Sequence, residues 1–218
     1  MHLHDYKGEK PELEIMDKWL LSKLNKAIKN ATESFDEYEY SKAKAEAEQF
    51  FWRTFCDNYL EIVKDRLYNN KRGKNAKTSA QHTLSRALNA VLKMFAPIMP
   101  FITEEIYHNY FAGKEKCRSI HVSSWPEIEK ISYDNEEKIG DYFVEVLGEV
   151  RKFKAGKNLS LKTPVKLTIP KEKEKVLKDV ADSVKPGYSA KPFIPVVPPV
   201  MIRPEVMQRM ARLEPRDE

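Results

Sequence analysis

Apolar residues recur at three- and four-residue intervals through most of the first 156 positions, and no other feature constrains the fold as strongly. From Pro11 onward the pattern occupies Leu13, Met16, Leu20, Leu24, Ala27, Ala31 and Phe35. This is the spacing of one face of an amphipathic helix. Because proline is tolerated in the first turn, we expect a first helix over residues 11–35.

Four later segments repeat the same periodicity. The helices they predict span residues 41–67, 79–95, 101–111 and 134–156. Ser41 is a favourable N-cap for the second helix, and the third is expected to begin after Thr78 or Ser79. Pro97 and Pro100 force the third helix to stop near Ala96.

Turn signals set the limits of the last two helices. Gly113 is the expected C-cap signal of the fourth. In the fifth, Glu137 stands three residues after Asp134, as in a capping box. Gly156 is expected to end the fifth helix.

Alternation of polar and apolar residues predicts two short strands among these helices. One spans residues 119–122 and is closed by Trp125-Pro126, and the other spans residues 165–169 before Pro170. Residues 171–184 are predicted to form a further amphipathic helix. The fold class is therefore mainly α, an antiparallel helical bundle with a small α/β appendage towards the C-terminus.

These elements divide the chain into four parts. We expect an N-terminal extension over residues 1–10, a helical bundle over 11–132, and the fifth helix with the small α/β appendage over 133–184. Residues 185–218 hold seven of the thirteen prolines. This density excludes a packed helix until about Glu205, and indicates an extended polyproline-like arm or a segment foreign to the natural gene.

Basic residues gather in two places, although the net charge is only +5. Residues 64–77 carry six basic residues and a single acid, and residues 151–166 carry six and no acid. Two such clusters favour a polyanionic partner, RNA above all. The alternatives are a solvated loop for the first cluster and cations that favour a helix C-terminus for the second.

Unpaired RNA bases need flat surfaces and hydrogen-bonding groups. Tyr68 flanks the first basic cluster at the end of an apolar stripe, where its ring is expected to face solvent. We interpret Trp52 and Tyr59 as core residues, because aromatic residues at helical spacing are usually buried. Asp57 and Asn58 either read base edges or form hydrogen bonds within the bundle.

Other classes of site find little support. The seven glycines are scattered, so no phosphate-binding loop can be assembled and nucleotide-binding catalysis is improbable. His2 with His4, and Glu104 with His108, lack a third ligand for a metal. Two isolated cysteines indicate reduced thiols, and the absence of a signal-peptide core or an apolar span predicts a cytoplasmic protein without membrane contact.

Five stretches in order resemble the anticodon-binding region of class I valyl-tRNA synthetases. The most specific is FFWRTFCDNYLE at residues 50–61. The others are MDKW at 16–19 with Leu24-Asn25, FAPIMPFITEEIY at 95–107, residues 120–126 and residues 150–170. The resemblance covers roughly residues 11–184. Isoleucyl- and leucyl-type relatives share the helical bundle, whereas the FW-x-x-FCD-x-YLE run is most similar to the valyl type.

The resemblance implies that the bundle binds the anticodon stem-loop of tRNA(Val) as a monomer and works with a catalytic body located elsewhere. ATP and Mg²⁺ would belong to that body. The HIGH-like and KMSKS-like signatures of a complete synthetase are missing, so we expect no catalytic residue, no metal site and no activity from this chain alone. Beyond Val184 the sequence departs from the family.

The residues expected to bind RNA are the basic and aromatic side chains of the two clusters and of the helix before them. They are Arg53, Lys64, Arg66, Tyr68, Lys71, Arg72, Lys74, Lys77, Arg151, Lys152, Lys154 and Lys157. Two other functions remain as alternatives. A helical scaffold or adaptor would capture a protein through its Pro-rich arm, and a stand-alone enzyme would require a cofactor or nucleophile signature, which the sequence lacks.

Overall fold

A computed structural model describes residues 3, 5–130, 132–160, 163 and 180 of the chain. Its described part is helical, which confirms the predicted mainly α bundle. The α-helices are α1 (Ile15–Asp36), α2 (Tyr40–Gln49), α3 (Leu60–Tyr68), α4 (Lys74–Phe95), α5 (Pro100–Tyr110), α6 (Ala112–Glu115) and α7 (Asp134–Gly156). A π-helix, η1 (Phe50–Tyr59), joins α2 to α3, and two 3₁₀ turns are η2 (Asn70–Arg72) and η3 (Ile120–Val122).

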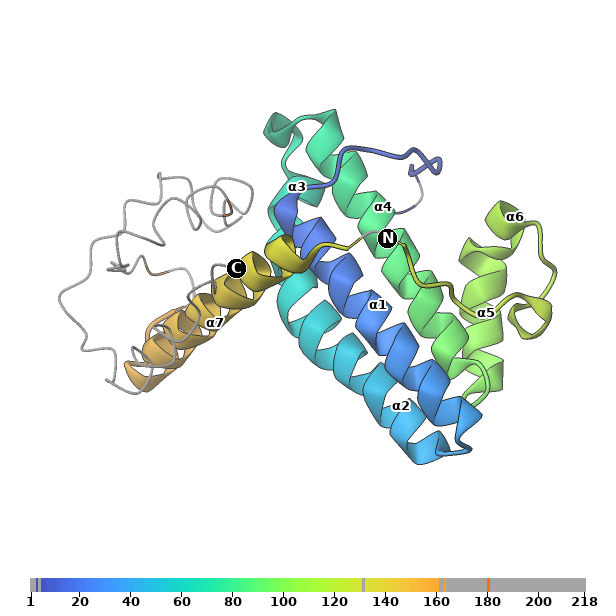
Figure 1. Cartoon of the computed structure of the whole chain (residues 1–218). Coiled ribbons are helices and arrows are strands. Elements are labelled where there is room, and N and C mark those ends of the chain that lie inside the picture. Colours follow the sequence, from blue (N-terminus) through green and yellow to red (C-terminus); the bar gives the residue numbers. More distant parts are fainter. Residues whose placement is uncertain (1–2, 4, 131, 161–162, 164–179, 181–218) are drawn as a thin grey trace, which may run out of the picture.

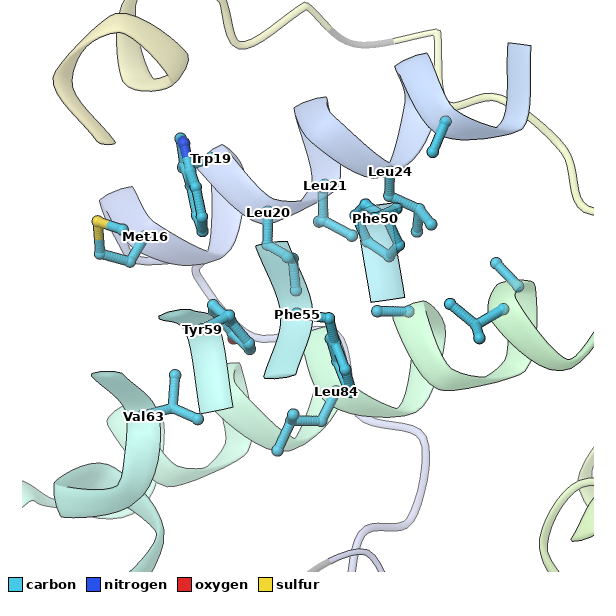
Figure 2. Packing of buried hydrophobic residues seen from close by; sticks show 14 of the residues in the cluster. Met16, Trp19, Leu20, Leu21, Leu24, Phe50, Phe55, Tyr59, Val63 and Leu84 are labelled. Atoms are coloured by element: carbon cyan, nitrogen blue, oxygen red, sulfur yellow. The ribbon is translucent and has the colours of Figure 1, made fainter. Parts of the chain in front are cut away.

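The core lies between α1, the long helix formed by α2, η1 and α3, and α4 (Figure 1). Leu20 of α1 points towards Phe55 of η1, and Leu24 of α1 lies on the side of Phe50 (Figure 2). Successive long helices run in opposite directions, so α1 and α4 are parallel and begin at the same end of the bundle (Figure 1). Each helix stabilises the bundle by burying one apolar stripe.

The π-helix suits the aromatic residues of its sequence. Phe50, Phe55 and Tyr59 are all buried, although five residues separate the first two. In an α-helix, a five-residue step turns a side chain away from the core, whereas the wider winding of a π-helix returns it to nearly the same face. The rings of Phe55 and Tyr59 then stack with their centroids 6.4 Å apart.

A buried polar network joins these helices where α1 begins. The Asp17 carboxylate accepts two hydrogen bonds from the Arg66 guanidinium, at 2.8 and 2.5 Å, and one from the Tyr59 hydroxyl at 2.5 Å. Ser79 of α4 also donates to Asp17, and Glu14 lies 3.2 Å from the guanidinium. Asp17 and Arg66 are almost fully buried. The network therefore fixes α1, η1, α3 and α4 relative to one another.

Replacing Asp17 should destabilise the fold strongly. In Asp17→Ala the Arg66 guanidinium stays buried and loses its carboxylate, which costs about 3–5 kcal/mol of unfolding free energy. Urea unfolding followed by circular dichroism measures the loss. Glu33→Ala is the control, because Glu33 forms an exposed pair with Lys29 at 3.8 Å and should cost about 1 kcal/mol or less. A loss in Asp17→Ala as small as in the control would contradict the structural role of the network.

The last described helix, α7, crosses α1 on the outside of the bundle (Figure 1). A Cβ atom at Gly140 would overlap the indole ring of Trp19, so glycine is what allows the two helices to approach this closely. The Trp19 indole nitrogen donates to Asp141 at 2.9 Å. These contacts place the buried face of α7 on α1.

Glu137 anchors the start of α7 electrostatically. Its carboxylate accepts hydrogen bonds from Lys26 at 2.6 Å, Ser22 at 2.6 Å and Lys23 at 2.9 Å. Burial opposes ionisation of this carboxyl, but the three hydrogen bonds outweigh it and hold the pKa of Glu137 at about 2. The predicted capping box at this helix start is wrong, because Tyr133 is the N-cap and makes no side-chain cap.

This depressed pKa predicts acid sensitivity. The pKa of this carboxyl is about 2 in the folded protein, against an ordinary value near 4.5. Its ionised form therefore stabilises the fold above about pH 4.5, and this stability is lost as the pH falls towards 2. The difference in unfolding free energy between the wild type and Glu137→Gln should therefore shrink over that range, by up to about 3 kcal/mol. Urea titrations at several pH values test this. The matched control is Glu145→Gln on the exposed side of α7. If the difference in unfolding free energy between the wild type and Glu137→Gln stayed constant with pH, the prediction would be wrong.

Several predicted boundaries differ from the structure. The helix predicted over 134–156 is confirmed at both ends. Helix α1 begins at Ile15, so Pro11 lies outside it, and α4 begins at Lys74, before the predicted Thr78. Helix α2 begins at Tyr40 with Glu39 as its N-cap, so Ser41 is not the cap.

Two local predictions after α5 are wrong. Residues 119–122 form a 3₁₀ turn instead of a strand, because Glu104 of α5 accepts hydrogen bonds from the Ser119 hydroxyl and the Ile120 backbone N–H, both at 2.9 Å. Gly113 lies inside α6, and the residue with left-handed backbone is Lys116.

The strand predicted at 165–169 and the arm at 185–218 lie outside the described residues, as does all of the 171–184 helix except Val180. Among the helices of the described part, none is long and apolar enough to cross a membrane.

Candidate nucleic-acid interface

The first predicted cluster lies at the end of the bundle where α1 and α4 begin, and we call it the basic end (Figure 1). It comprises Lys64 and Tyr68 of α3, Lys71 and Arg72 of η2, and Lys74 and Lys77 of α4. Gly73 connects η2 to α4 with φ of +84°, a conformation that favours glycine. Asn69 orders the turn, since its side-chain oxygen accepts from the Lys71 backbone N–H at 3.1 Å.

Three side chains of the basic end are well exposed. The Tyr68 residue is 68% exposed, the Lys74 side chain is 85% exposed, and Lys71 is exposed as well. Lys64 is partly exposed and pairs with Glu61 at 2.5 Å, and Arg72 lies 3.4 Å from Asp65. The predicted solvent exposure of Tyr68 is therefore confirmed.

Two predicted RNA-binding residues are corrected by their burial. Arg66 is 1% exposed and its guanidinium is bound to Asp17, so it belongs to the core network. Its basic character suggested a surface role, but sequence alone did not reveal the buried carboxylate. Lys154 is also buried, and burial lowers the pKa of its ammonium group. Neither side chain is accessible to a nucleic acid in this arrangement.

Acidic residues of the N-terminal segment, residues 5–12, lie across the basic end. Asp5 pairs with Lys77 at 2.5 Å and accepts from Gln81 at 2.8 Å, and Glu9 lies 3.6 Å from Lys74. The Tyr6 hydroxyl donates to the Glu9 carbonyl at 2.8 Å, which helps to hold the segment in place. Two of the predicted RNA-binding lysines thus already have carboxylate partners within the chain.

The second cluster forms where the C-terminal part of α7 meets η1, and we call it the α7 cluster. Arg151 donates to the Asp57 carbonyl at 3.1 Å and to the Asn58 side-chain oxygen at 3.2 Å. The Asn58 amide also donates to the Arg53 carbonyl at 2.7 Å. Asn58 therefore forms hydrogen bonds within the protein, one of the two roles expected from the sequence.

The remaining cations of the α7 cluster are exposed. Arg53 is exposed on η1, Lys152 pairs with Glu149 at 2.8 Å on the surface of α7, and Lys157 follows the helix end. The structure thus brings the Arg151 side chain to the segment of η1 that carries Arg53, although 98 positions separate the two residues in sequence. It does not merge the α7 cluster with the basic end.

The two aromatic residues interpreted as core differ from each other. Tyr59 is fully buried, and burial raises the pKa of its hydroxyl well above the ordinary value, so the group stays protonated and donates to Asp17. The core interpretation of Tyr59 is confirmed. The same interpretation is wrong for Trp52, which is 58% exposed. An α-helical period cannot detect this, because the π winding changes which residues face outward.

The described part contains hollows at the basic end and beside α4. A cavity of about 260 Å³ at the basic end is lined by Arg66, Asn69, Gly73, Lys74 and Lys77. A larger hollow of about 500 Å³ lies between α1, α4 and residues 122–127. Within the described ranges, no group of three or more His, Cys, Asp or Glu side chains is arranged to hold a metal ion.

Comparison with known proteins decides the family. A family profile described as "Anticodon-binding domain of tRNA ligase" matches residues 17–169, more than half of the chain. The chain belongs to this family. The matched range begins at Asp17 and includes its three partners Tyr59, Arg66 and Ser79, so the core network lies within the anticodon-binding domain.

Individual relatives agree with this assignment. The chain is 47% identical over 160 residues to the valine–tRNA ligase of Ehrlichia canis, and the match covers 72% of this chain and 20% of that protein. It is 43% identical over 155 residues to the valine–tRNA ligase of the Wolbachia of Brugia malayi. That match covers 70% of this chain and 18% of the relative.

A third match, to the valine–tRNA ligase of Methanothermobacter thermautotrophicus, is 35% identical over 216 residues and covers 96% of this chain and 24% of the relative. The chain thus spans about a fifth to a quarter of the length of the relatives it matches.

Proposed function

We propose that this chain is one part of a valine–tRNA ligase and that it binds the anticodon stem-loop of tRNA(Val). The observation that carries the proposal is the basic end, where an exposed tyrosine ring stands beside exposed lysines in a domain of the anticodon-binding family. The relatives named above are valine–tRNA ligases, which favours the valyl over the isoleucyl or leucyl type.

The chemistry of the basic end suits an RNA hairpin. Lys71 and Lys74 carry mobile ammonium groups that neutralise phosphates and release counterions, a source of affinity that does not depend on sequence. Tyr68 offers a ring on which an unpaired loop base stacks. Cations would thus hold the stem while an aromatic contact distinguishes a loop with unstacked bases from a plain duplex.

The remaining features of the proposal concern the whole ligase. The chemical step, with its ATP and Mg²⁺, would belong to a catalytic part outside this sequence, and the chain alone would be inactive. We place the protein in the cytoplasm and treat this domain as a monomer. The scaffold alternative is less well supported, because the anticodon-binding family accounts for the bundle without requiring a protein partner.

The basic end predicts a salt-dependent loss of RNA affinity on substitution. Replacing Lys71 and Lys74 together with alanine should weaken binding of a tRNA anticodon stem-loop and lower the magnitude of the slope of log K against log salt by roughly 1.5–2. Fluorescence anisotropy over a salt series measures both quantities. The matched control is Lys42→Ala with Lys44→Ala on α2, which removes the same charge from the other end of the bundle. Unchanged affinity and slope in a folded Lys71/Lys74 variant would overturn the proposal.

Tyr68→Ala is the contrasting variant in the same assay. Loss of a stacked base should cost roughly 1–3 kcal/mol of binding free energy and leave the salt slope nearly unchanged. Tyr68→Phe keeps the ring and should retain most of the affinity. A loss as large in Tyr68→Phe as in Tyr68→Ala would assign the effect to the hydroxyl and contradict stacking.

The N-terminal segment predicts an increase in affinity. Asp5→Asn with Glu9→Gln removes the carboxylates that pair with Lys77 and Lys74 and that compete with RNA phosphates. Exposed pairs of this kind are weak, so binding should tighten by about two- to fivefold. Glu33→Gln with Glu37→Gln at the far end of α1 removes equal charge and is the control. If the two double variants gained the same RNA affinity, net charge alone would explain the effect.

A further inference from the structure

The exposed face of the π-helix carries a cluster that the bundle does not use. Phe50, Phe55 and Tyr59 turn inward along η1, and the exposed positions between them are Trp52, Arg53 and Asp57. Asp57 stands five residues after Trp52, about one turn of a π-helix, so the two lie near each other on the outer face. The exposed face of η1 thus carries an indole ring, a guanidinium and a carboxylate within six residues.

Trp52 differs from the other two tryptophans of the chain. Trp19 is buried and its indole nitrogen donates to Asp141, and the Trp125 nitrogen donates to Thr32 at 2.8 Å. Trp52 instead leaves 58% of its surface in solvent. Single exposed aromatic residues are common at protein surfaces, so exposure alone does not make Trp52 a binding site and its neighbours decide.

The indole of Trp52 is supported from within the protein. The Phe51 ring packs against it with centroids 4.8 Å apart and planes inclined by 64°. Phe51 itself packs against the hydrophobic core. This contact orients the indole before any ligand arrives, which lowers the entropy cost of stacking on it.

Two helices bring arginines to this part of η1. Arg53 follows Trp52 directly, and Arg151 of α7 reaches the backbone of Asp57 and the side chain of Asn58 next to it. An aromatic ring with neighbouring arginines is the composition of a single-stranded nucleic-acid site, in which a base stacks and its phosphate meets a cation. The Asp57 carboxylate is an acceptor suited to the amino group of a base.

We propose that Trp52, with Arg53 and Arg151, forms a second RNA site that stacks one unpaired nucleobase. The site deepens the proposed function and rests on it. Trp52 and Tyr68 are sixteen residues apart, and this segment spans less than the roughly 24 Å of an α-helix of that length because its first half is π-helical and rises less per residue. About seven steps of a stacked duplex cover that distance, so one hairpin reaches both the basic end and the Trp52 site.

Tryptophan fluorescence of the full chain tests the site with a tRNA anticodon stem-loop. Saturating RNA should quench the emission, and Trp52→Phe should abolish most of that quenching because Trp19 and Trp125 stay within the fold. Trp52→Ala should weaken binding roughly 5- to 100-fold with an unchanged salt slope, and Trp52→Phe should weaken it less because a ring remains. Tyr40→Ala, an equally exposed aromatic on α2, is the matched control and should bind like the wild type.

The outcomes separate this site from the basic end. If Trp52→Ala binds the hairpin as tightly as the wild type, or the wild-type emission does not change, the second site is wrong while RNA binding stands. Equal quenching by a blunt duplex without unpaired bases would also overturn it. So would a concentration-dependent shift of the Trp52 emission without RNA, because a protein surface would then cover the ring. If neither the wild type nor any variant binds the hairpin, the proposed function is wrong and the Trp52 site is wrong with it.

Discussion

The buried pair of Asp17 and Arg66 is the interaction on which the arrangement of the bundle depends. Two charged groups are costly to remove from water, and this cost is offset when their geometry is good and further hydrogen bonds reach them. Here the carboxylate receives bonds from the guanidinium, from Tyr59 and from Ser79. Since these donors come from three separate elements, any displacement of one helix leaves a buried charge without a partner.

The same pair determines where the basic end lies. Arg66 is held in the core two residues before the end of α3, so Tyr68 and η2 follow from a fixed point and project outward. Gly73 then reverses the chain into α4, whose Ser79 returns to the same carboxylate. The exposed lysines of the basic end are thus carried on a turn that is anchored on both sides by one buried network.

Sequence reasoning succeeded where a single local pattern decides the structure. The limits of α7 follow from its amphipathic stripe and its flanking residues, and Tyr68 was expected to be exposed because it ends an apolar stripe. The family was recognisable because FFWRTFCDNYLE combines unusual residues in fixed order.

The errors arise where a distant contact overrides the local pattern. In the sequence Arg66 is one more cation of a basic run, and only the structure shows that it binds Asp17, 49 positions away. Residues 119–122 alternate like a strand, but Glu104 gathers their donors into a turn. Trp52 fits an apolar helical stripe, yet the π winding turns it outward. In the first two cases the deciding interaction is tertiary, and in the third it is a local change of helix winding, so the residue types alone carry no signal of either.

The distribution of charge also bears on how such a domain recognises RNA. The net charge of +5 is modest, and Asp5, Glu9 and Asp65 neutralise part of the basic end, so few lysines are left to provide unspecific electrostatic affinity. Attraction to any polyanion is thereby weakened, whereas the stacking proposed for Tyr68 and Trp52 would not depend on these carboxylates. Because stacking requires unpaired bases, a larger share of the binding free energy then depends on the loop of the RNA. Acidic neighbours that lower total affinity can in this way raise the discrimination between a hairpin loop and a plain duplex.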